Sequence, residues 1–365
     1  ARPGPPSLLR YDYPLVHVPG SMDDAAVSLL RKVSERKPLT EDECVYLLGF
    51  PEDSPEADMT VCFADRLSRI ANDNTGEIGA QIGIITGPCI ADCGFCKYAV
   101  GTTDADDFVM SDDTLRDYIG RITEHGDVTV ISLMTIHSFD FEDLLCAVRV
   151  AREEAPEDVV IAVNTGDLTR QQCISLRNAG VGRAYHAIRL GEGDVTRLNP
   201  FDRLETVRNL MSASIGVVTC TEPVGPEDSA REIVRSYLGS EKEGFIHGSV
   251  AKRVPVPGTR MGGCGEVSDR RLMHIASVLL LSTAWKADVS APVGYYGGFY
   301  GGFGKVYAEY AGNPRDPKDY SEKSEGKTVG WARRKLFEDG YSKIRKADGS
   351  TVPLDRDYLR MTGSL

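Results

Sequence analysis

The sequence predicts an α/β protein whose parallel strands form a (β/α)8 barrel of the TIM type, either complete or lacking its last part. Short apolar segments alternate with helical segments of ten or more residues, a pattern typical of parallel sheets. About eight such units are expected, the number that closes a barrel. A doubly wound open sheet is the alternative fold. Three cysteines directly follow the first predicted barrel strand, where barrel enzymes carry their chemistry.

Composition and charge narrow the class of protein. The chain has 365 residues, 41% of them hydrophobic and 26% charged, which is ordinary for a globular protein. Its formal net charge of −12 argues against a general nucleic-acid surface or an anionic-membrane surface. No apolar run reaches roughly eighteen residues, so no membrane span is expected. The N-terminus lacks the apolar core of a signal peptide, and a cytoplasmic location is expected.

Residues 1–76 are predicted to precede the barrel. A Pro-rich leader over 1–23 is expected to wrap the surface. Thr40 is a predicted helix N-cap, because acidic residues follow it and suit the helix dipole. Helices are expected at about 24–36, 40–48 and 58–73.

The barrel itself is predicted over residues 77–311. Its expected strands are Gln81–Thr86, Val128–Met134, Val159–Asn164, Tyr185–Leu190, Ile215–Thr221, Phe245–Pro255, Ala287–Ala291 and Val306–Tyr310. Its expected helices are Ser111–His125, Phe141–Glu154, Leu168–Ala179, Arg203–Ser214, Pro226–Leu238 and Asp269–Lys286.

Two segments near the C-terminus stand apart from this alternation. The stretch 292–304 is rich in glycine and aromatic residues, which suits either a substrate-cavity wall or a tight loop packed on the barrel. The tail over 312–365 is charged and contains a predicted helix, Trp331–Asp339. This tail is expected to cap the outside of the barrel.

The cysteines Cys89, Cys93 and Cys96 are spaced to hold a metal cluster. The chain has nine cysteines, and these three lie too close together for a sensible disulfide framework. Three thiolates bind three irons of a [4Fe–4S] cube and leave the fourth iron open to an exogenous ligand. A zinc site and a ferredoxin-like site are the alternatives, but both usually require four protein ligands.

The C-x3-C-x2-C pattern, with Phe95 before the third cysteine, resembles the signature of the radical S-adenosylmethionine (SAM) superfamily. Segments around Thr86–Pro88, Thr165–Leu168 and Phe201–Val207 are similar to its biotin synthase branch, which includes the maturase HydE and methylornithine synthase. The resemblance implies a [4Fe–4S] cluster, SAM and an electron donor such as ferredoxin or flavodoxin. It also implies that reductive cleavage of SAM yields a 5′-deoxyadenosyl radical, which abstracts hydrogen from a small-molecule substrate.

The resemblance also suggests which residues bind the cofactor. It implies that Arg203 pairs with the SAM carboxylate, although a surface Arg paired with Asp202 or Glu205 is the alternative. Arg189 is expected to bind an anionic substrate or part of SAM, or else to form a buried ion pair with Glu192 or Asp194. The other candidate cofactor-binding residues are Phe95, Tyr98, Thr135, Asn164 and Val256, with His137 and Thr165 nearby.

Departures from the family pattern bear on the reaction. Biotin synthase keeps further ligands for a second cluster, and the corresponding positions here are about Leu133, Ala162, Val218 and Asp288. None of these can serve as the expected ligand, so the chain is predicted not to be biotin synthase itself. The ribose-binding Asn-x-Asp of the family maps to Ala187 and Arg189, just after His186.

His186, Cys220 and Glu222 are the candidate catalytic residues. Glu222 follows the fifth predicted strand and suits a cationic or hydroxylated substrate, while Cys220 is either a hydrogen donor, a ligand or simply core. The favoured hypothesis is a radical SAM enzyme of cofactor or amino-acid-derivative biosynthesis, acting as a monomer or homodimer. A sulfur-inserting synthase with a second cluster and a non-enzymatic iron–sulfur or zinc protein are the alternatives.

Overall fold

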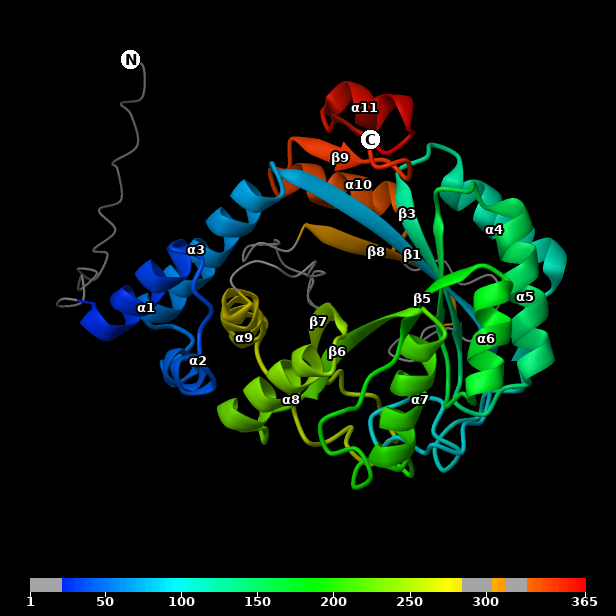
Figure 1. Cartoon of the computed structure of the whole chain (residues 1–365), viewed down its shortest axis with the longest axis horizontal. Coiled ribbons are helices and arrows are strands. Elements are labelled where there is room, and N and C mark those ends of the chain that lie inside the picture. Colours follow the sequence, from blue (N-terminus) through cyan, green and yellow to red (C-terminus); the bar gives the residue numbers. More distant parts are fainter. Residues whose placement is uncertain (1–21, 284–303, 313–326) are drawn as a thin grey trace, which may run out of the picture.

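The strands form a curled parallel sheet that makes a partial barrel (Figure 1). A computed structural model describes residues 22–283, 304–312 and 327–365. In this part of the chain the barrel strands run in the order β8 (Lys305–Ala311), β1 (Thr75–Thr86), β3 (Val128–Thr135), β4 (Val160–Asn164), β5 (Val181–Tyr185), β6 (Gly216–Val224) and β7 (Ile246–Lys252). The predicted α/β barrel fold is therefore confirmed as a half-barrel.

A layer of helices covers the outer face of this sheet (Figure 1). It contains α4 (Asp112–Thr123), α5 (Phe141–Glu154), α6 (Arg170–Asn178), α7 (Pro200–Ser212), α8 (Ala230–Lys242) and α9 (Asp269–Ser282). Each helix starts where a polar side chain accepts a hydrogen bond from the first turn, and Ser229 and Glu232 form a complete capping box at α8. The Ser229 cap explains why α8 begins at Ala230, four residues after the predicted start at Pro226.

The two faces of the sheet differ in chemistry. Side chains such as Ile82, Ile131 and Val163 are fully buried in the apolar core that the strands share with the helices. On the other face, the residues paired across the strands include polar ones such as Gln81, Ser132 and Asn164. Because side chains alternate along a strand, one face of each strand packs on helices and the other faces the barrel interior.

The N-terminal helices lie against the barrel helices on one side of the molecule (Figure 1). They are α1 (Asp24–Ser34), α2 (Glu41–Leu48) and α3 (Pro55–Ala71), and they match the three predicted helices. Helix α2 packs on α8 and α9, and α3 packs on α9. The arrangement buries Leu47 and Leu48 of α2 in the main core.

One predicted strand is wrong, and another is longer than predicted. The fourth strand is Val181–Tyr185 rather than Tyr185–Leu190, because residues 186–190 form a buried loop whose apolar side chains imitate a strand. The first strand begins at Thr75, six residues before the predicted start. The early part of this strand is only weakly apolar, but it still pairs with its neighbours in the sheet. It contains Gly79, where an added Cβ would lie 2.5 Å from the Tyr307 ring. The predicted strand Ala287–Ala291 and nearly all of the leader and of 292–304 lie outside the described residues.

Short elements extend the sheet at both ends of β1. The strand β2 (Phe108–Val109) pairs antiparallel with its end, and β9 (Lys343–Arg345) pairs parallel with its start. The C-terminal elements are α10 (Val329–Glu338), β10 (Thr351–Pro353) and α11 (Arg356–Met361). Sequence reasoning found only α10 of these, because two- and three-residue strands carry no readable alternation. Among the described residues, no helix is long and apolar enough to cross a membrane.

A buried ion pair fixes the C-terminal tail to the barrel. Arg333 of α10 donates two hydrogen bonds of 2.7 and 2.8 Å to Asp127, which immediately precedes β3. The hydroxyl of Tyr358 donates a third, of 2.8 Å, to the same carboxylate. Because Asp127 is fully buried, its charge depends on these partners.

We therefore expect Asp127→Ala to lower the free energy of unfolding by about 3–5 kcal/mol, since it leaves the Arg333 guanidinium buried and unpaired. The measurement is urea unfolding followed by far-UV circular dichroism. Asp357→Ala is the control, because its pair with Arg360 is exposed and is worth less than about 1 kcal/mol. If Asp127→Ala lowers the free energy of unfolding as little as the control does, the buried ion pair does not stabilise the attachment of the tail.

A second stability prediction concerns His274 of α9. Burial and the neighbouring Arg271 lower the pKa of His274 to about 4, from an ordinary value of 6.5. Between these two values the unfolded chain binds a proton that the folded chain rejects, so folding stability falls as the pH drops from 6.5 to 4. Relative to His274→Met, the wild type should lose about 3 kcal/mol between pH 7 and pH 4. Urea unfolding of both proteins at the two pH values measures this difference. If both proteins lose the same free energy of unfolding, protonation of His274 does not cause the loss.

Candidate active site

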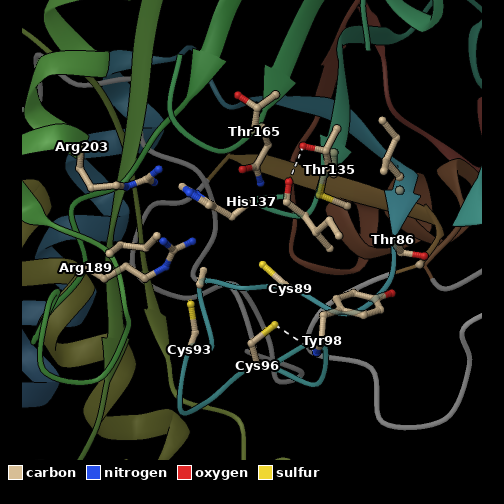
Figure 2. A pocket seen from close by; sticks show the side chains of 18 residues that line it. Thr86, Cys89, Cys93, Cys96, Tyr98, Thr135, His137, Thr165, Arg189 and Arg203 are labelled. Atoms are coloured by element: carbon tan, nitrogen blue, oxygen red, sulfur yellow. Dashed lines mark hydrogen bonds between the residues drawn. The ribbon is translucent and has the colours of Figure 1, made fainter. Parts of the chain in front are cut away.

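A cavity of about 120 Å³ opens at the carboxyl ends of β1, β3 and β4. Its wall includes the three clustered cysteines, so the predicted cluster loop does meet the barrel mouth (Figure 2). The polar and sulfur-bearing side chains that line it are Thr86, Cys89, Cys93, Cys96, Tyr98, Met134, Thr135, His137, Asn164, Thr165, Arg189 and Arg203. The position agrees with the general rule that barrel chemistry sits after the strands.

Backbone hydrogen bonds close the cysteine loop and attach it to two other loops. The amide of Cys89 donates a 2.7 Å hydrogen bond to the carbonyl of Tyr98, which closes the loop on itself. At Gly94, the amide donates to Val195 at 2.8 Å and the carbonyl accepts from Met261 at 2.7 Å. A Cβ on Gly94 would meet the Met261 side chain at 3.2 Å, so a residue without a side chain suits this close approach. Loops following three different strands therefore meet at Gly94.

The thiols fit the predicted iron–sulfur cluster in chemistry and placement. Figure 2 shows the sulfur atoms of Cys89, Cys93 and Cys96 gathered on one side of the cavity. Burial raises the pKa of the Cys93 thiol to about 12, while Arg189 acts in the opposite direction and favours the thiolate. Among the described residues, no three His, Cys, Asp or Glu side chains are grouped to hold a single metal ion. A cube does not need such grouping, since each thiolate binds a different iron.

Arg203 is buried, and each of its terminal nitrogens donates one hydrogen bond. One terminal nitrogen donates a 2.9 Å hydrogen bond to Asp167, and the other donates a 3.0 Å bond to the carbonyl of Ala187. Its side chain is only 3% exposed, so the surface pairing with Asp202 or Glu205 is not formed. Burial lowers the pKa of Arg203, while Asp167 and Glu192 support its charge.

Asp167 is the centre of a charged cluster that the sequence did not reveal. Besides Arg203, it lies 3.4 Å from Nε2 of His186 and 4.0 Å from Nε2 of His137. Burial opposes its ionisation, but His186 and Arg203 outweigh burial and lower its pKa to about 2. The pKa of His186 falls to about 4 through burial, and that of His137 is also lowered by burial. Asp167 was visible in the sequence only as part of a family-like segment.

The guanidinium of Arg189 makes fewer hydrogen bonds than that of Arg203. In the described part of the chain it makes no hydrogen bond through its side chain; Glu222 lies 3.5 Å away and Glu192 lies 3.8 Å away. Burial opposes its charge, but Glu222, Cys93 and Glu192 raise its pKa above the ordinary value. Its guanidinium also lies 5.9 Å from the centre of the Phe95 ring. The expected ion pair with Glu192 is therefore present, and Arg189 lines the cavity as well.

The structure separates the remaining predicted residues into two groups. Tyr98, Thr135 and Asn164 line the cavity, as do His137 and Thr165. Phe95, His186, Cys220, Glu222 and Val256 do not line it. Phe95 and Glu222 instead flank Arg189, and His186 flanks Asp167.

Cys220 and Val256 are the clearest departures from the expected site. Cys220 is 4% exposed on β6, and it lies outside the main apolar core that the strands share with the helices. Val256 is 4% exposed, and its carbonyl accepts a turn hydrogen bond from Thr259. Both residues are therefore buried, and neither lines the cavity.

Comparison with curated proteins points to one kind of relative. No family model matches the chain. The biotin synthase of Persephonella marina is 24% identical over 276 residues, which cover 71% of this chain and 79% of that protein. The biotin synthase of Rippkaea orientalis is 24% identical over 253 residues, which cover 65% and 67% of the two chains.

Solved structures show the same fold. Methylornithine synthase (PylB) matches with a TM-score of 0.74 at 17% identity, covering 88% of this chain and 98% of its own. HydG, a maturase of the [FeFe]-hydrogenase, matches with a TM-score of 0.70 at 14% identity, covering 88% and 76%. The half-barrel, the three-cysteine loop and the sequence relatives together define a radical SAM enzyme. Within that superfamily, the chain is similar in sequence to biotin synthase and in fold to PylB and HydG.

Proposed function

We propose that this radical SAM enzyme uses a [4Fe–4S] cluster and SAM to abstract a hydrogen atom from a small molecule in cofactor or amino-acid-derivative biosynthesis. The observation that carries the proposal is the placement of three thiols and two arginines around one cavity at the barrel mouth. Cys89, Cys93 and Cys96 hold the cluster. When bound, the cluster and SAM supply a 5′-deoxyadenosyl radical, with the electron coming from a ferredoxin or flavodoxin.

The protein's own residues bind and orient SAM. A carboxylate is best held by a guanidinium that has free donors. Arg203 has both terminal nitrogens occupied by Asp167 and Ala187, whereas Arg189 has no side-chain hydrogen bond in the described residues. We therefore assign the SAM carboxylate chiefly to Arg189, with Arg203 supporting the site from behind. Thr135, Asn164 and Tyr98 line the same cavity and are positioned to contact other parts of SAM.

The barrel interior supports a reaction other than the biotin synthase reaction. Ala162 and Val218 occupy two of the positions that the family resemblance gives to second-cluster ligands, and neither binds iron. Leu133, the third, is fully buried in the outer apolar core, so it does not face the interior.

Replacement of Cys93 by Ala tests the function directly. We expect the anaerobically reconstituted variant to lose the iron–sulfur absorption and all dithionite-dependent formation of 5′-deoxyadenosine, because one iron of the cube loses its protein ligand. Cys62→Ala is the matched control, since Cys62 is exposed on α3 and distant in the chain from the loop. Iron and sulfide near four of each per wild-type chain are expected. Retained cleavage in Cys93→Ala would refute the proposed function.

The assignment of Arg189 has its own test. Arg189→Gln should weaken SAM binding by about tenfold to a hundredfold, as expected for the loss of a charge-assisted hydrogen bond. Arg203→Gln should weaken it less and should mainly lower stability. Arg208→Gln is the control, because Arg208 is exposed on the same helix as Arg203. Equilibrium dialysis of SAM against the reconstituted proteins measures all three. A larger loss with Arg203→Gln would show that Arg203 leaves Asp167 to take the carboxylate, and would overturn the assignment.

A further inference from the structure

The loop between β5 and α7 contacts two parts of the active site. Its first part carries Arg189, whose guanidinium lines the cavity (Figure 2). Its later part holds the cysteine loop through the backbone. The carbonyl of Val195 accepts a 2.8 Å hydrogen bond from the amide of Gly94. The amide of Arg197 donates a 2.8 Å hydrogen bond to the carbonyl of Ala91. This one loop therefore joins the candidate SAM-binding cation to the backbone that carries the thiols.

The carboxylate of Glu192 links the two parts of this loop. One carboxylate oxygen accepts a 3.0 Å hydrogen bond from the backbone amide of Arg189, and the other accepts a 2.7 Å bond from the hydroxyl of Thr196. The side chain of Glu192 is only 1% exposed, and it does not line the cavity. Glu192 therefore closes the segment from Arg189 to Thr196 from inside the protein.

Thr196 extends this network to the attachment of the cysteine loop. Its hydroxyl oxygen accepts hydrogen bonds of 3.2 Å from two backbone amides of the same loop. Thr196 lies between Val195 and Arg197, the two residues whose backbone holds the cysteine loop. The bond from Thr196 to Glu192 thus connects that attachment to the backbone of Arg189.

Glu192 also lies close to both guanidinium groups of the site. Its carboxylate is 3.8 Å from a terminal nitrogen of Arg189 and 3.9 Å from Nε of Arg203. A carboxylate that is buried this deeply is costly unless donors and cations surround it. Any arrangement of the loop that breaks these contacts leaves a buried charge without partners, so the contacts restrict where Arg189 can lie.

We propose that Glu192 is a positioning residue for SAM: it fixes Arg189 relative to the cysteine loop, and so determines how tightly SAM is bound, without contacting SAM itself. The inference rests on the proposed function and on the assignment of the SAM carboxylate to Arg189. A ligand that is held at two points binds best when the protein fixes both points beforehand, because less freedom is then lost on binding.

The test is a double-mutant cycle on SAM binding, measured by equilibrium dialysis against the anaerobically reconstituted proteins. Glu192→Gln removes the charge and one acceptor oxygen, so we expect SAM to bind about tenfold more weakly. If Glu192 acts through Arg189, Glu192→Gln should cost almost no further affinity in a protein that already carries Arg189→Gln. Losses that simply add in the double variant would overturn the proposal.

Variants of Thr196 separate position from charge. Thr196→Val removes the hydroxyl that bonds to Glu192 but keeps every charge of the site, and it should weaken SAM binding severalfold. Thr196→Ser restores the hydroxyl and should recover most of the affinity. Asp194→Asn is the charge control, because Asp194 is exposed on the same loop, and it should bind SAM as the wild type does. If Thr196→Val binds SAM as tightly as the wild type, Glu192 acts through its charge alone and the positioning role is wrong.

Iron content and the midpoint of thermal unfolding are measured for every variant, and only variants that match the wild type in both enter the comparison. If Glu192→Gln does not assemble, Thr196→Val and Thr196→Ser provide the test by themselves.

The outcomes are separable from those of the proposed function. If the wild type cleaves SAM and the cycle of Glu192 and Arg189 is additive, the positioning role is overturned and the radical SAM function stands. If Arg189→Gln binds SAM as the wild type does, the positioning role fails together with the assignment of Arg189. If the wild type makes no 5′-deoxyadenosine, the proposed function itself fails.

Discussion

The need to compensate two buried arginines organises the active site. Arg189 and Arg203 both line the cavity, and each guanidinium would be costly to bury alone. Asp167 comes from the loop after β4, Glu192 from the loop after β5, and Glu222 from the end of β6. The carboxylates therefore do more than balance charge. They join the loops after β4 and β5 to the end of β6 in one wall of the cavity, beside Cys93.

The two arginines are compensated to different degrees, and that difference has a chemical consequence. Asp167 holds Arg203 at hydrogen-bond distance, so a new anion on Arg203 would compete with a carboxylate that is already bound. Glu222 and Glu192 keep Arg189 charged from 3.5 Å or more, which leaves its donors available to the cavity. In such a site, Arg203 stabilises the structure and Arg189 is available to bind an anion. A chain with overall negative charge thus presents a local cation beside Cys93.

Much of the fold was predictable because strong local signals agreed with tertiary packing. The helix Phe141–Glu154 is found at its predicted bounds, since Asp140 caps it and its apolar residues recur on one face. The strand at Tyr185–Leu190 was misplaced because a buried loop has the same apolar composition as a strand. The cysteines were found from spacing alone, whereas Asp167 could not be found. Its importance depends on His137, His186 and Arg203, which reach it from different loops and at no fixed spacing.

The same limit explains why the barrel interior could be read only in the structure. Matching the chain to biotin synthase places Leu133 and Ala162 at ligand positions, but these two residues face opposite sides of the sheet. Ser132, not Leu133, is the interior neighbour of Ala162. A shift of one residue exchanges the two faces of a strand, and distant sequence similarity does not fix it. Once the register is known, the interior face of β3 and β4 proves to hold Ser132 and Ala162 instead of further thiols. The spacing of the cysteine loop could therefore be recognised from sequence, whereas the side chains on the interior face are known only once the strand register is known.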